Sequence, residues 1–318
     1  MVSNKIISFT IITPVFNRSD CIGKCIESVI NQKYEDIEHW IVDDGSTDST
    51  FDIIEKFAAK YPYIQHYRFD KNQGVNAARN YAIKNSSKDF IIFLDSDDYF
   101  IENALNTVNN IILSNPYYMH YLFAQDDRMN YFNQNPILKK EQTEITFSDF
   151  LTEKIYGDFV HVMASNLLRQ FPFDVEYRIY EGLNFLRIYK NAGKLLFTRK
   201  ILVNRDRGRK DSVTKETLLT NKNALNNQYC VLREALSLFR ADYLECKAEK
   251  KLSNLIKRIF ILGLALEKYK EVAVTKTLAK ELNVKILLPF QIIYLMRLGF
   301  ILQKILFLYS SIKNHILH

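Results

Sequence analysis

Three carboxylates lie within four positions of the sequence and directly follow an apolar run, Phe90 to Leu94. They are Asp95, Asp97 and Asp98. Like charges this close repel one another, and a divalent cation between them removes that repulsion. Mg²⁺ and Mn²⁺ prefer oxygen ligands, bridge to phosphate oxygens and act as Lewis acids on a departing phosphate. The acids therefore predict a metal site for phosphate chemistry; the alternative is a solvated turn in which Asp98 caps the next helix.

Two further polar groups follow apolar segments in the same manner. The first is Thr13 to Asn17, and the second is the pair Asp43 and Asp44. Ligands of open α/β sheets bind at the carboxyl ends of the strands, so these groups and the three acids are expected at one edge of a sheet. The sequence contains neither GxGxxG after the first strand nor GxxxxGK[ST]. Because these backbone cradles for phosphate are missing, a cation is expected to take their place.

The elements that must position these groups alternate along the first part of the chain, up to about residue 115. Strands are expected at 6–16, 39–44, 63–69 and 89–94, and helices at 20–32, 46–62, 75–85 and 101–116. This alternation is typical of a mostly parallel, Rossmann-like α/β sheet flanked by helices. Cys25 falls on the apolar face of the first helix, so we expect a core residue rather than a reactive thiol.

Four motifs occur together over residues 9 to about 100, and their order is that of a known family. They are TPVFN at Thr13, VDDGSTDST at Val42, NQGVNAARN at Asn72 and LDSDD at Leu94. The set resembles the GT-A glycosyltransferases of family 2, and more loosely so do FDVEYRIYEGLNFLRIY and NRDRGRKDSVT. The resemblance implies a GT-A fold and inverting transfer from a nucleotide-diphosphate sugar, typically a UDP-sugar, with Mn²⁺ or Mg²⁺. It also implies a place in bacterial polysaccharide assembly.

The resemblance further implies a role for each matching position. At the first strand end, the residues that would line the nucleotide pocket are Thr13, Pro14, Val15 and Asn17. At the second, Asp43 or Asp44 would accept a hydrogen bond from the base, with Ser46 in the adjoining turn. The turn also suits a helix N-cap, and both interpretations can hold together.

The third and fourth motifs would complete the donor site. The loop and helix that would pack against the nucleotide and its phosphates contribute Asn72, Gly74, Arg79 and Asn80. For Arg79 the alternative is a salt bridge on the helix surface. Ribose and metal would be held by Asp95, Ser96 and Asp97, with Asp98 as an added acid beside Asp97 on the metal.

The base of the reaction is expected in the second half of the domain. An inverting transfer needs a group that deprotonates the acceptor hydroxyl, and a carboxylate opposite the leaving diphosphate serves well. The family usually supplies an Asp that follows a Glu, but here Glu181 is followed by Gly182. Three interpretations stay open: Glu181 is the base, Asp174 or Glu176 substitutes, or the donor is bound without turnover. We favour Glu181, because general-base catalysis depends on whether the carboxylate reaches the hydroxyl more than on whether it belongs to Asp or Glu. The alternative is that Glu181 only stabilises the N-terminus of a helix.

A basic segment and a histidine complete the candidates. The segment contains Arg205, Arg207, Arg209 and Lys210, and family members often place a loop here that closes over the diphosphate or adds a metal contact. Basic groups there would stabilise the leaving charge, although a solvated turn has the same composition. His161 lies in the apolar run FVHVMA and is expected in the core.

The last hundred residues change character. Long amphipathic helices are expected from about residue 215, and the C-terminal tail, residues 283–318, contains Lys285, Arg297, Lys304 and Lys313 but no acid. Arg297 at the centre of a membrane-spanning helix would cost about 2.5–3.5 kcal/mol. A helix that lies in the interface of an anionic membrane is therefore favoured, and docking on the protein or on another copy is the alternative.

Composition sets the remaining expectations. The chain of 318 residues is 47% hydrophobic and 25% charged with net charge +7, which predicts a packed domain with an appendage. We expect a GT-A domain over 1–210, with a nucleotide half of about 1–115 and an acceptor half of about 116–210, and a helical region over 211–318. None of the four cysteines forms a CxxC pair, and the N-terminus has no signal-peptide pattern, which favours the cytoplasm. The basic excess then indicates the inner face of the plasma membrane rather than nucleic acid.

The function predicted is thus metal-dependent glycosyl transfer to a glycan or lipid-linked glycan acceptor. Within the same fold a polyprenyl-phosphate sugar synthase is the alternative, and Gly182 leaves room for a non-catalytic partner that binds nucleotide sugars. Nucleotidyl transfer is disfavoured, because no Gly-rich loop bearing Arg or Lys follows the first strand. The sequence leaves open whether the protein forms a homo-oligomer.

Overall fold

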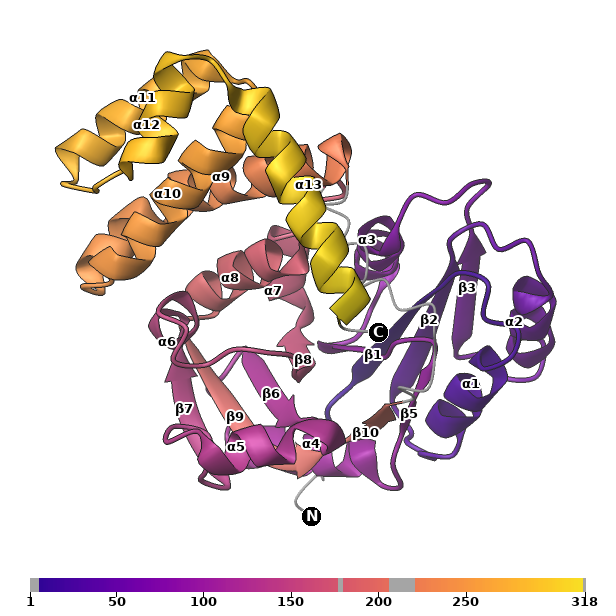
Figure 1. The fold of residues 1–318 in the computed structure, drawn as a ribbon. Coiled ribbons are helices and arrows are strands. Elements are labelled where there is room, and N and C mark those ends of the chain that lie inside the picture. The colour runs from indigo at the N-terminus through magenta and orange to yellow at the C-terminus, as the bar shows by residue number, and fades with distance from the viewer. Residues whose placement is uncertain (1–5, 177–179, 206–220, 317–318) are drawn as a thin grey trace. The chain divides into compact units, whose positions relative to one another are not determined.

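The computed structural model describes residues 6–176, 180–205 and 221–316. The chain divides into two compact units, Met1–Arg209 and Lys210–His318. The first is an α/β unit and the second consists of helices (Figure 1). The fold class predicted from the sequence, a GT-A-like α/β sheet followed by helices, is confirmed.

The first unit is built on one sheet of eight strands in the order β3-β2-β1-β4-β8-β6-β9-β7. The strands at one end are all parallel: β1 (Phe9–Val15), β2 (Ile37–Asp43), β3 (Ile64–Arg68) and β4 (Phe90–Phe93). The rest of the sheet is mixed, with β6 (His120–Ala124), β7 (Gln142–Thr146), β8 (Val160–Ala164) and β9 (Lys194–Ile201). A separate two-stranded sheet pairs β5 (Asp98–Phe100) with β10 (Val203–Arg205).

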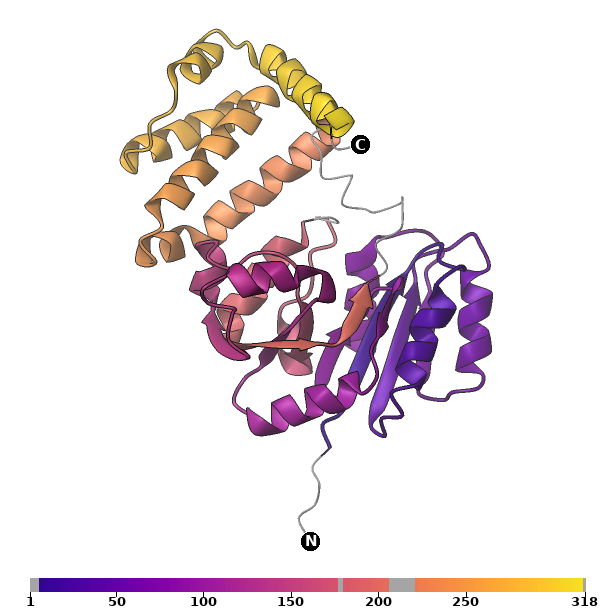
Figure 2. The ribbon, with the colours of Figure 1, turned by 60° about the horizontal axis from the view of Figure 1, so that its bottom comes forward.

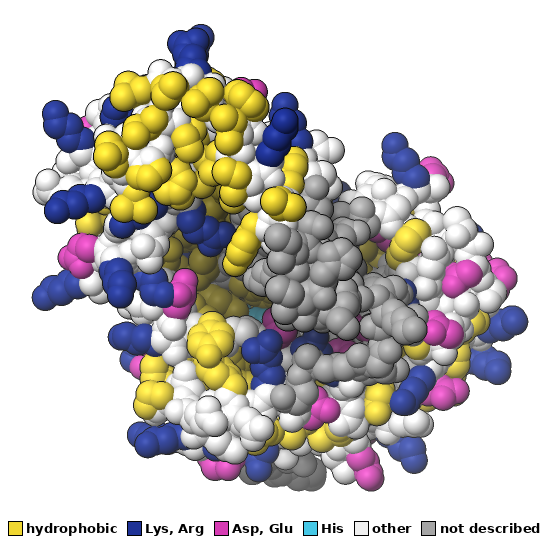
Figure 3. Space-filling view, viewed as in Figure 1, with side chains coloured by type: hydrophobic (Ala, Val, Ile, Leu, Met, Phe, Trp, Pro, Cys, Tyr) yellow, Lys and Arg dark blue, Asp and Glu magenta, His cyan; other side chains and the backbone are white. Residues whose placement is uncertain are grey.

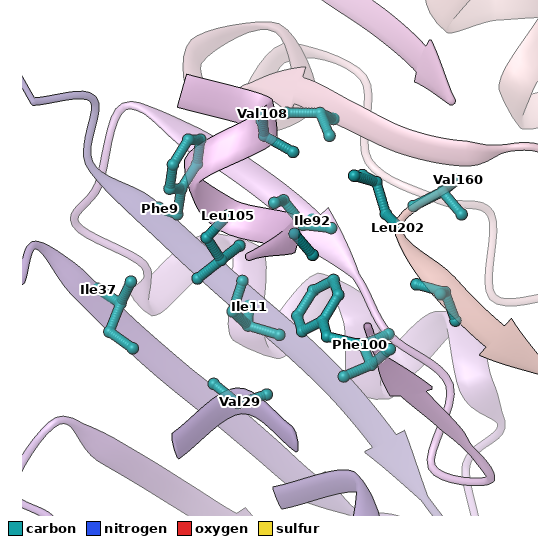
Figure 4. Packing of buried hydrophobic residues seen from close by; sticks show 14 of the residues in the cluster. Phe9, Ile11, Val29, Ile37, Ile92, Phe100, Leu105, Val108, Val160 and Leu202 are labelled. Carbon is teal, nitrogen blue, oxygen red and sulfur yellow. The ribbon is translucent and has the colours of Figure 1, made fainter. Parts of the chain in front are cut away.

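Helices cover both faces of the parallel strands (Figure 1). One face packs against α1 (Ile22–Ile30), α2 (Thr50–Ala58) and α4 (Ala104–Ser114), and the other against α3 (Val75–Asn85), α7 (Ser165–Gln170) and α8 (Glu181–Ala192). Ile11 faces the first set and Ile12 the second, because successive side chains of a strand point to opposite faces. Figure 4 shows the first core, where Phe9 and Ile11 meet Leu105 and Val108. Shorter segments on the mixed side are η1 (Asp126–Arg128), α5 (Met129–Gln134) and α6 (Phe147–Leu151).

The second unit is a set of helices (Figure 2), and its apolar side chains form a main core and a smaller cluster that includes Leu252 and Ile256. The helices are α9 (Lys222–Glu245), α10 (Glu249–Ala265), α11 (Tyr269–Glu281), α12 (Leu288–Leu295) and α13 (Gly299–Ile316). α10 lies at the centre and contacts α9, α11, α12 and α13. At the start of α13, a Cβ on Gly299 would lie 2.0 Å from the Leu264 carbonyl oxygen, so only glycine permits this close approach.

The turns in this unit all have one form, although the sequence offers little turn chemistry. Each of the first four helices is followed by a residue with positive φ: Lys247, Glu267, Asn283 and Arg297. The next residue donates its backbone N–H to the carbonyl five positions earlier, as Ala248 does to Tyr243. This is the Schellman ending, which satisfies the last carbonyls of a helix and is usually built with glycine. Three of the four positions here carry charged side chains instead.

Candidate active site

The carboxyl ends of β1, β2 and β4 lie side by side, as the sequence predicted. Val15 pairs with Asp43 in the β1–β2 register, and Asp44 donates its backbone N–H to the Val15 carbonyl at 2.8 Å. The Leu94 N–H continues the ladder from β4 to the Ile12 carbonyl at 3.0 Å. The loops that follow these strands therefore share one edge of the sheet.

Asn17 connects the loop after β1 to the loop after β2. Its backbone N–H donates to Ser46 Oγ at 2.8 Å, and its Oδ1 accepts from the Thr47 N–H at 2.8 Å. Its φ is 51°, in the left-handed region that asparagine tolerates better than most residues. The Arg18 N–H adds a bond to Thr50 Oγ1 at 2.7 Å. Asn17 thus fixes the shape of the edge through its backbone conformation and its side chain.

Asp43 is fully buried and held by protein donors. Its Oδ1 accepts from the Ser46 N–H at 3.1 Å and from the Ser46 hydroxyl, and the Arg68 guanidinium lies 3.3 Å from Oδ2. Burial raises the pKa of Asp43, while the bonds from Ser46 and the charge of Arg68 act in the opposite direction.

Asp44 is also buried, and its two oxygens hold the loop that leads into α3. Oδ1 accepts from the Gln73 N–H at 2.6 Å, and Oδ2 accepts from the Gly74 N–H at 2.8 Å. Gly74 has φ 96°, which a residue with a side chain rarely adopts. Beside it, the amide oxygen and nitrogen of Asn72 are both buried and lack a hydrogen-bond partner in the structure.

The other residues predicted at the first strand end face the protein interior. Thr13 is fully buried, and its hydroxyl lies 3.0 Å from Nε2 of His39. Burial lowers the pKa of His39 to about 3, so this imidazole is neutral. Pro14 and Val15 are buried as well. A nucleotide at this edge would therefore meet their backbone rather than the Thr13 side chain.

Arg79 joins the two halves of the unit. From α3 its Nη1 lies 2.6 Å from Glu181 Oε1, and its Nη2 lies 3.5 Å from Asp95 Oδ1. The side chain is only 8% exposed, so the alternative of a salt bridge on the helix surface is excluded. The guanidinium also lies over the rings of Phe93 and Phe173, at 5.1 and 5.6 Å from their centroids. Burial acts to lower the pKa of Arg79, but Glu181 and Asp95 outweigh it and raise that pKa, which keeps the cation.

Glu181 is the first residue of α8, where the helix dipole favours a carboxylate. Its side chain is 31% exposed and accessible to a substrate. The next residue, Gly182, faces open space, because a Cβ there would meet no atom within 4 Å. Of the two substitutes considered for the base, Asp174 accepts a hydrogen bond from the Glu176 N–H, and Glu176 is exposed.

Two asparagines of α3 fasten the start of α8. Asn80 exchanges two hydrogen bonds with the Phe173 backbone, at 2.7 and 2.9 Å, and Asn76 donates to the Asp174 carbonyl at 2.8 Å. The Asp174 N–H in turn donates to Asn184 of α8 at 3.1 Å. Asn80, expected beside the nucleotide, therefore anchors the segment that leads to Glu181.

The three acids after β4 do not share one environment. Asp95 is half exposed and Asp97 is partly exposed, whereas Asp98 is buried as the first residue of β5. Arg205 of β10 lies opposite Asp98, with Nε 3.7 Å from Oδ2. Among the residues that the structure describes, no group of three or more His, Cys, Asp or Glu could hold a metal by itself. The structure differs here from the expected three-acid cluster, because the strand pairing turns Asp98 toward an arginine.

Asp95 and Asp97 nevertheless fit an ion of a particular kind. Mg²⁺ and Mn²⁺ in phosphate sites are often held by one or two carboxylates together with the phosphate oxygens of the substrate. Two acids exposed at the edge, with a third that is balanced by an arginine, provide that ligand set. The site therefore suits a metal that arrives with a diphosphate rather than a metal held by protein alone.

The sequence indicates Arg205 as a candidate of the diphosphate loop but does not indicate its partners. Its Nη1 lies 2.7 Å from Gln125 Oε1 and 3.5 Å from Asp158 Oδ2. Gln125 and Asp158 belong to none of the sequence motifs, so no motif could have indicated them. Arg207, Arg209 and Lys210 lie outside the described residues.

The two expectations for core residues are confirmed. Cys25 is buried, and burial raises the pKa of its thiol. His161 is buried, stacks on Phe185 with ring centroids 4.3 Å apart, and has a ring nitrogen 3.0 Å from His120. Burial, followed by the charge of Arg79, lowers the pKa of His161 to about 3.

Comparison with known proteins identifies a family for the chain. A model of the Glycosyl transferase family 2 matches residues 10–171. A GalNAc(5)-diNAcBac-PP-undecaprenol beta-1,3-glucosyltransferase of Campylobacter jejuni is 30% identical over 224 residues, which cover 68% of this chain and 69% of that protein. The glycosyltransferase GlyA of Streptococcus pneumoniae is 28% identical over 61% of this chain, but the match covers only 30% of its length.

Solved structures agree at the level of the fold. TarS 1–349 of S. aureus in complex with UDP-GlcNAc superposes with a TM-score of 0.60 at 22% identity, over 82% of this chain and 76% of that one. A mannosyltransferase from Pyrobaculum calidifontis in complex with GDP-Man and Mn²⁺ reaches 0.56 at 15% identity, over 96% of this chain and 88% of its own.

Proposed function

The chain belongs to glycosyltransferase family 2, and from this premise we propose that it is an inverting, metal-dependent enzyme of surface polysaccharide biosynthesis. It would move a sugar from a nucleotide-diphosphate sugar, with a UDP-sugar as first choice, to a glycan or lipid-linked glycan acceptor. The observation that carries the proposal is the Arg79 guanidinium, which contacts both Asp95 on the donor edge and Glu181 on the acceptor side. A donor and an acceptor bound at these two acids would lie next to each other.

Glu181 would act as the general base. It would take the proton of the acceptor hydroxyl while that oxygen attacks the anomeric carbon and the bond to the diphosphate breaks. A position at a helix N-terminus, fixed by an arginine at 2.6 Å, orients the carboxylate. Asp174 and Glu176 rank lower, since neither has the contact with Arg79 that aligns Glu181 with Asp95.

The donor edge would bind the nucleotide and the metal. The loops fixed by Asn17, Asp43 and Asp44 would shape the pocket for the nucleobase. Asp95 and Asp97 would lie beside the ribose and the cation. When bound, Mn²⁺ or Mg²⁺ supplies positive charge to the departing diphosphate. Asp98 would act through Arg205, whose Nε lies 3.7 Å from its Oδ2.

The substrates are proposed from the relatives. The Campylobacter jejuni enzyme is named for a polyprenyl-diphosphate-linked glycan acceptor, and TarS was solved with UDP-GlcNAc and with UDP. Shorter matches include minor teichoic acid biosynthesis proteins of Bacillus subtilis. A lipid-linked acceptor would place the enzyme at the cytoplasmic face of the plasma membrane. A non-catalytic binder of nucleotide sugars is the second candidate, and the observation that favours it is Gly182 beside the single acid Glu181.

The test is turnover of a panel of nucleotide sugars by purified protein with Mn²⁺, together with calorimetric binding of each donor. Glu181→Gln should lower kcat by about 10²–10⁴-fold and leave donor affinity within about twofold, because general-base catalysis contributes that factor. Glu176→Gln, at an exposed acid nearby, tests the alternative base and should leave kcat near the wild-type value. Donor binding without hydrolysis or transfer to any acceptor would favour the non-catalytic candidate. Binding that does not depend on metal would refute the metal-dependent enzyme, and no binding of any nucleotide with or without metal would refute both.

A further inference from the structure

α12 is an apolar helix that lies on the surface of the second unit. Its sequence is LPFQIIYL, and none of its residues is buried. Leu288 and Leu295 are 68% and 72% exposed. Exposed leucines of this kind forgo the stabilisation that each would gain from burial. A helix with this composition therefore indicates a surface that is covered by something else.

The exposed side chains continue from α12 into the start of α13. Figure 3 shows apolar side chains gathered over this part of the second unit, with Lys and Arg side chains at the margin. We call this surface the apolar face, and its residues include Leu288, Ile292, Leu295, Met296, Phe300 and Ile305. Leu302 of α13 is buried in the core of the unit, so that helix is anchored on its other side.

The segment that carries the apolar face, residues 282–318, has charged side chains of one sign only. Lys285, Arg297 and Lys304 are exposed in this region, and no Asp or Glu occurs after Glu281. A second copy of the same surface would bring the same positive charges against these and be repelled. Anionic phospholipid headgroups would attract them, while the leucines enter the boundary between headgroups and acyl chains.

The way this surface can meet a bilayer is restricted by helix length. Among residues 6–176, 180–205 and 221–316, no helix has the length and apolar character needed to cross a bilayer. α12 spans only eight residues, so it can lie parallel to the membrane plane but cannot enter deeply.

We propose that the apolar face is a docking surface for an anionic phospholipid bilayer, with α12 in the interface and Lys285 and Lys304 on the headgroups. The link to the proposed function is one of purpose only: docking would hold the enzyme where a lipid-linked acceptor lies. The exposure and the charge of the apolar face support docking without it. Docking is reversible, because it rests on a few side chains and on charge that salt screens.

The experiment is co-sedimentation of the full chain with vesicles of phosphatidylcholine alone or with 30% phosphatidylglycerol, at about 0.05 and 0.5 M NaCl. We expect binding to the anionic vesicles at low salt and at least tenfold weaker binding to phosphatidylcholine. Leu288→Glu/Leu295→Glu should weaken binding at least tenfold. Lys285→Gln and Lys304→Gln should each weaken it about fivefold at low salt. Tyr117→Glu, at an apolar residue that is 93% exposed in the first unit, is the control and should bind like wild type.

Four outcomes would overturn the proposal, the last of them nucleotide binding with no vesicle binding. One is equal sedimentation with both vesicle types, and another is binding that the leucine and lysine variants leave unchanged. The third is a wild-type dimer in the absence of vesicles that Leu288→Glu/Leu295→Glu dissociates, since a second copy would then cover the face. Thermal unfolding and nucleotide binding of each variant show whether it is folded. Nucleotide binding with no vesicle binding refutes this surface alone, whereas vesicle binding with no nucleotide binding refutes the proposed function alone.

Discussion

The donor edge and the acceptor side of the site are held together by different means. At the donor edge, Asn17 and Asp44 bind the backbone of neighbouring loops, and Asp43 binds the backbone of Ser46 in its own loop. On the acceptor side, Glu181 is held by the charge of one arginine that comes from the donor half. The donor pocket is thus fixed by several hydrogen bonds to loop backbone, whereas the carboxylate of the proposed base is oriented by one long-range ion pair.

Replacing Arg79 is the strongest way to test this difference. Arg79→Gln should lower kcat at least about 100-fold, because a misplaced base loses its alignment. It should also cost about 1–3 kcal/mol of unfolding free energy, because two carboxylates lose a charged partner. Arg79→Lys keeps the positive charge but loses the planar guanidinium that can contact two carboxylates, so it should recover part of kcat. Steady-state kinetics with donor binding as a second readout measure both.

Arg187→Gln, at a partly exposed arginine of α8, is the control for the change in charge. If Arg79→Gln raised the donor Kd and left kcat intact, Arg79 would serve the nucleotide rather than the base.

Low pH should destabilise the folded first unit, because a buried neutral histidine lies in its donor half and another in its acceptor half. His39 and His161 have a pKa of about 3 in the folded protein, against about 6.5 when unfolded. The lowered pKa gives stability that is fully present above pH 6.5 and is lost as the pH falls toward 3. We expect the loss to reach about 1.4 kcal/mol per pH unit for each histidine.

Denaturant unfolding at pH 7, 6 and 5 measures this loss. His39→Gln, whose amide can still bond Thr13, should reduce the change in unfolding free energy per pH unit. If that change is the same as in the wild type, His39 does not contribute.

Asp44→Asn tests the donor edge. Asparagine has one acceptor oxygen, so one of the bonds to Gln73 or Gly74 is lost. We expect a cost of about 1–3 kcal/mol and weaker donor binding, with kcat changed less than by Arg79→Gln. Asp70→Asn, at an exposed acid in the β3–α3 loop that Asp44 holds, is the control. Loss of kcat without loss of donor affinity would contradict the division of roles.

Gly182→Ala should have the smallest effect. The added Cβ meets nothing within 4 Å, and alanine in a helix is favoured over glycine by about 0.5–1 kcal/mol. We therefore expect slightly higher stability and near-normal turnover. A fall in kcat would show that the space beside Glu181 belongs to the acceptor.

Much of the fold could be predicted because the signals are local. The strand and helix periods of the first part of the chain, and the polar groups at the strand ends, follow from spacing along the chain. The mixed strands β6 to β9 were not specified in this way, since short apolar runs do not show which neighbour they pair with. The Schellman turns of the second unit were also missed, because their left-handed residues are mostly charged rather than glycine.

The sequence by itself determined which residue types gather at the edge of the sheet, because each motif follows a strand and parallel strands end together. Only the tertiary structure decided which partner each of them takes. It buried Arg79 between Asp95 and Glu181, which are 16 and 102 positions away, and it turned Asp98 from its neighbours toward Arg205. Contacts of that separation depend on how strands pair and helices pack, and no local pattern encodes them.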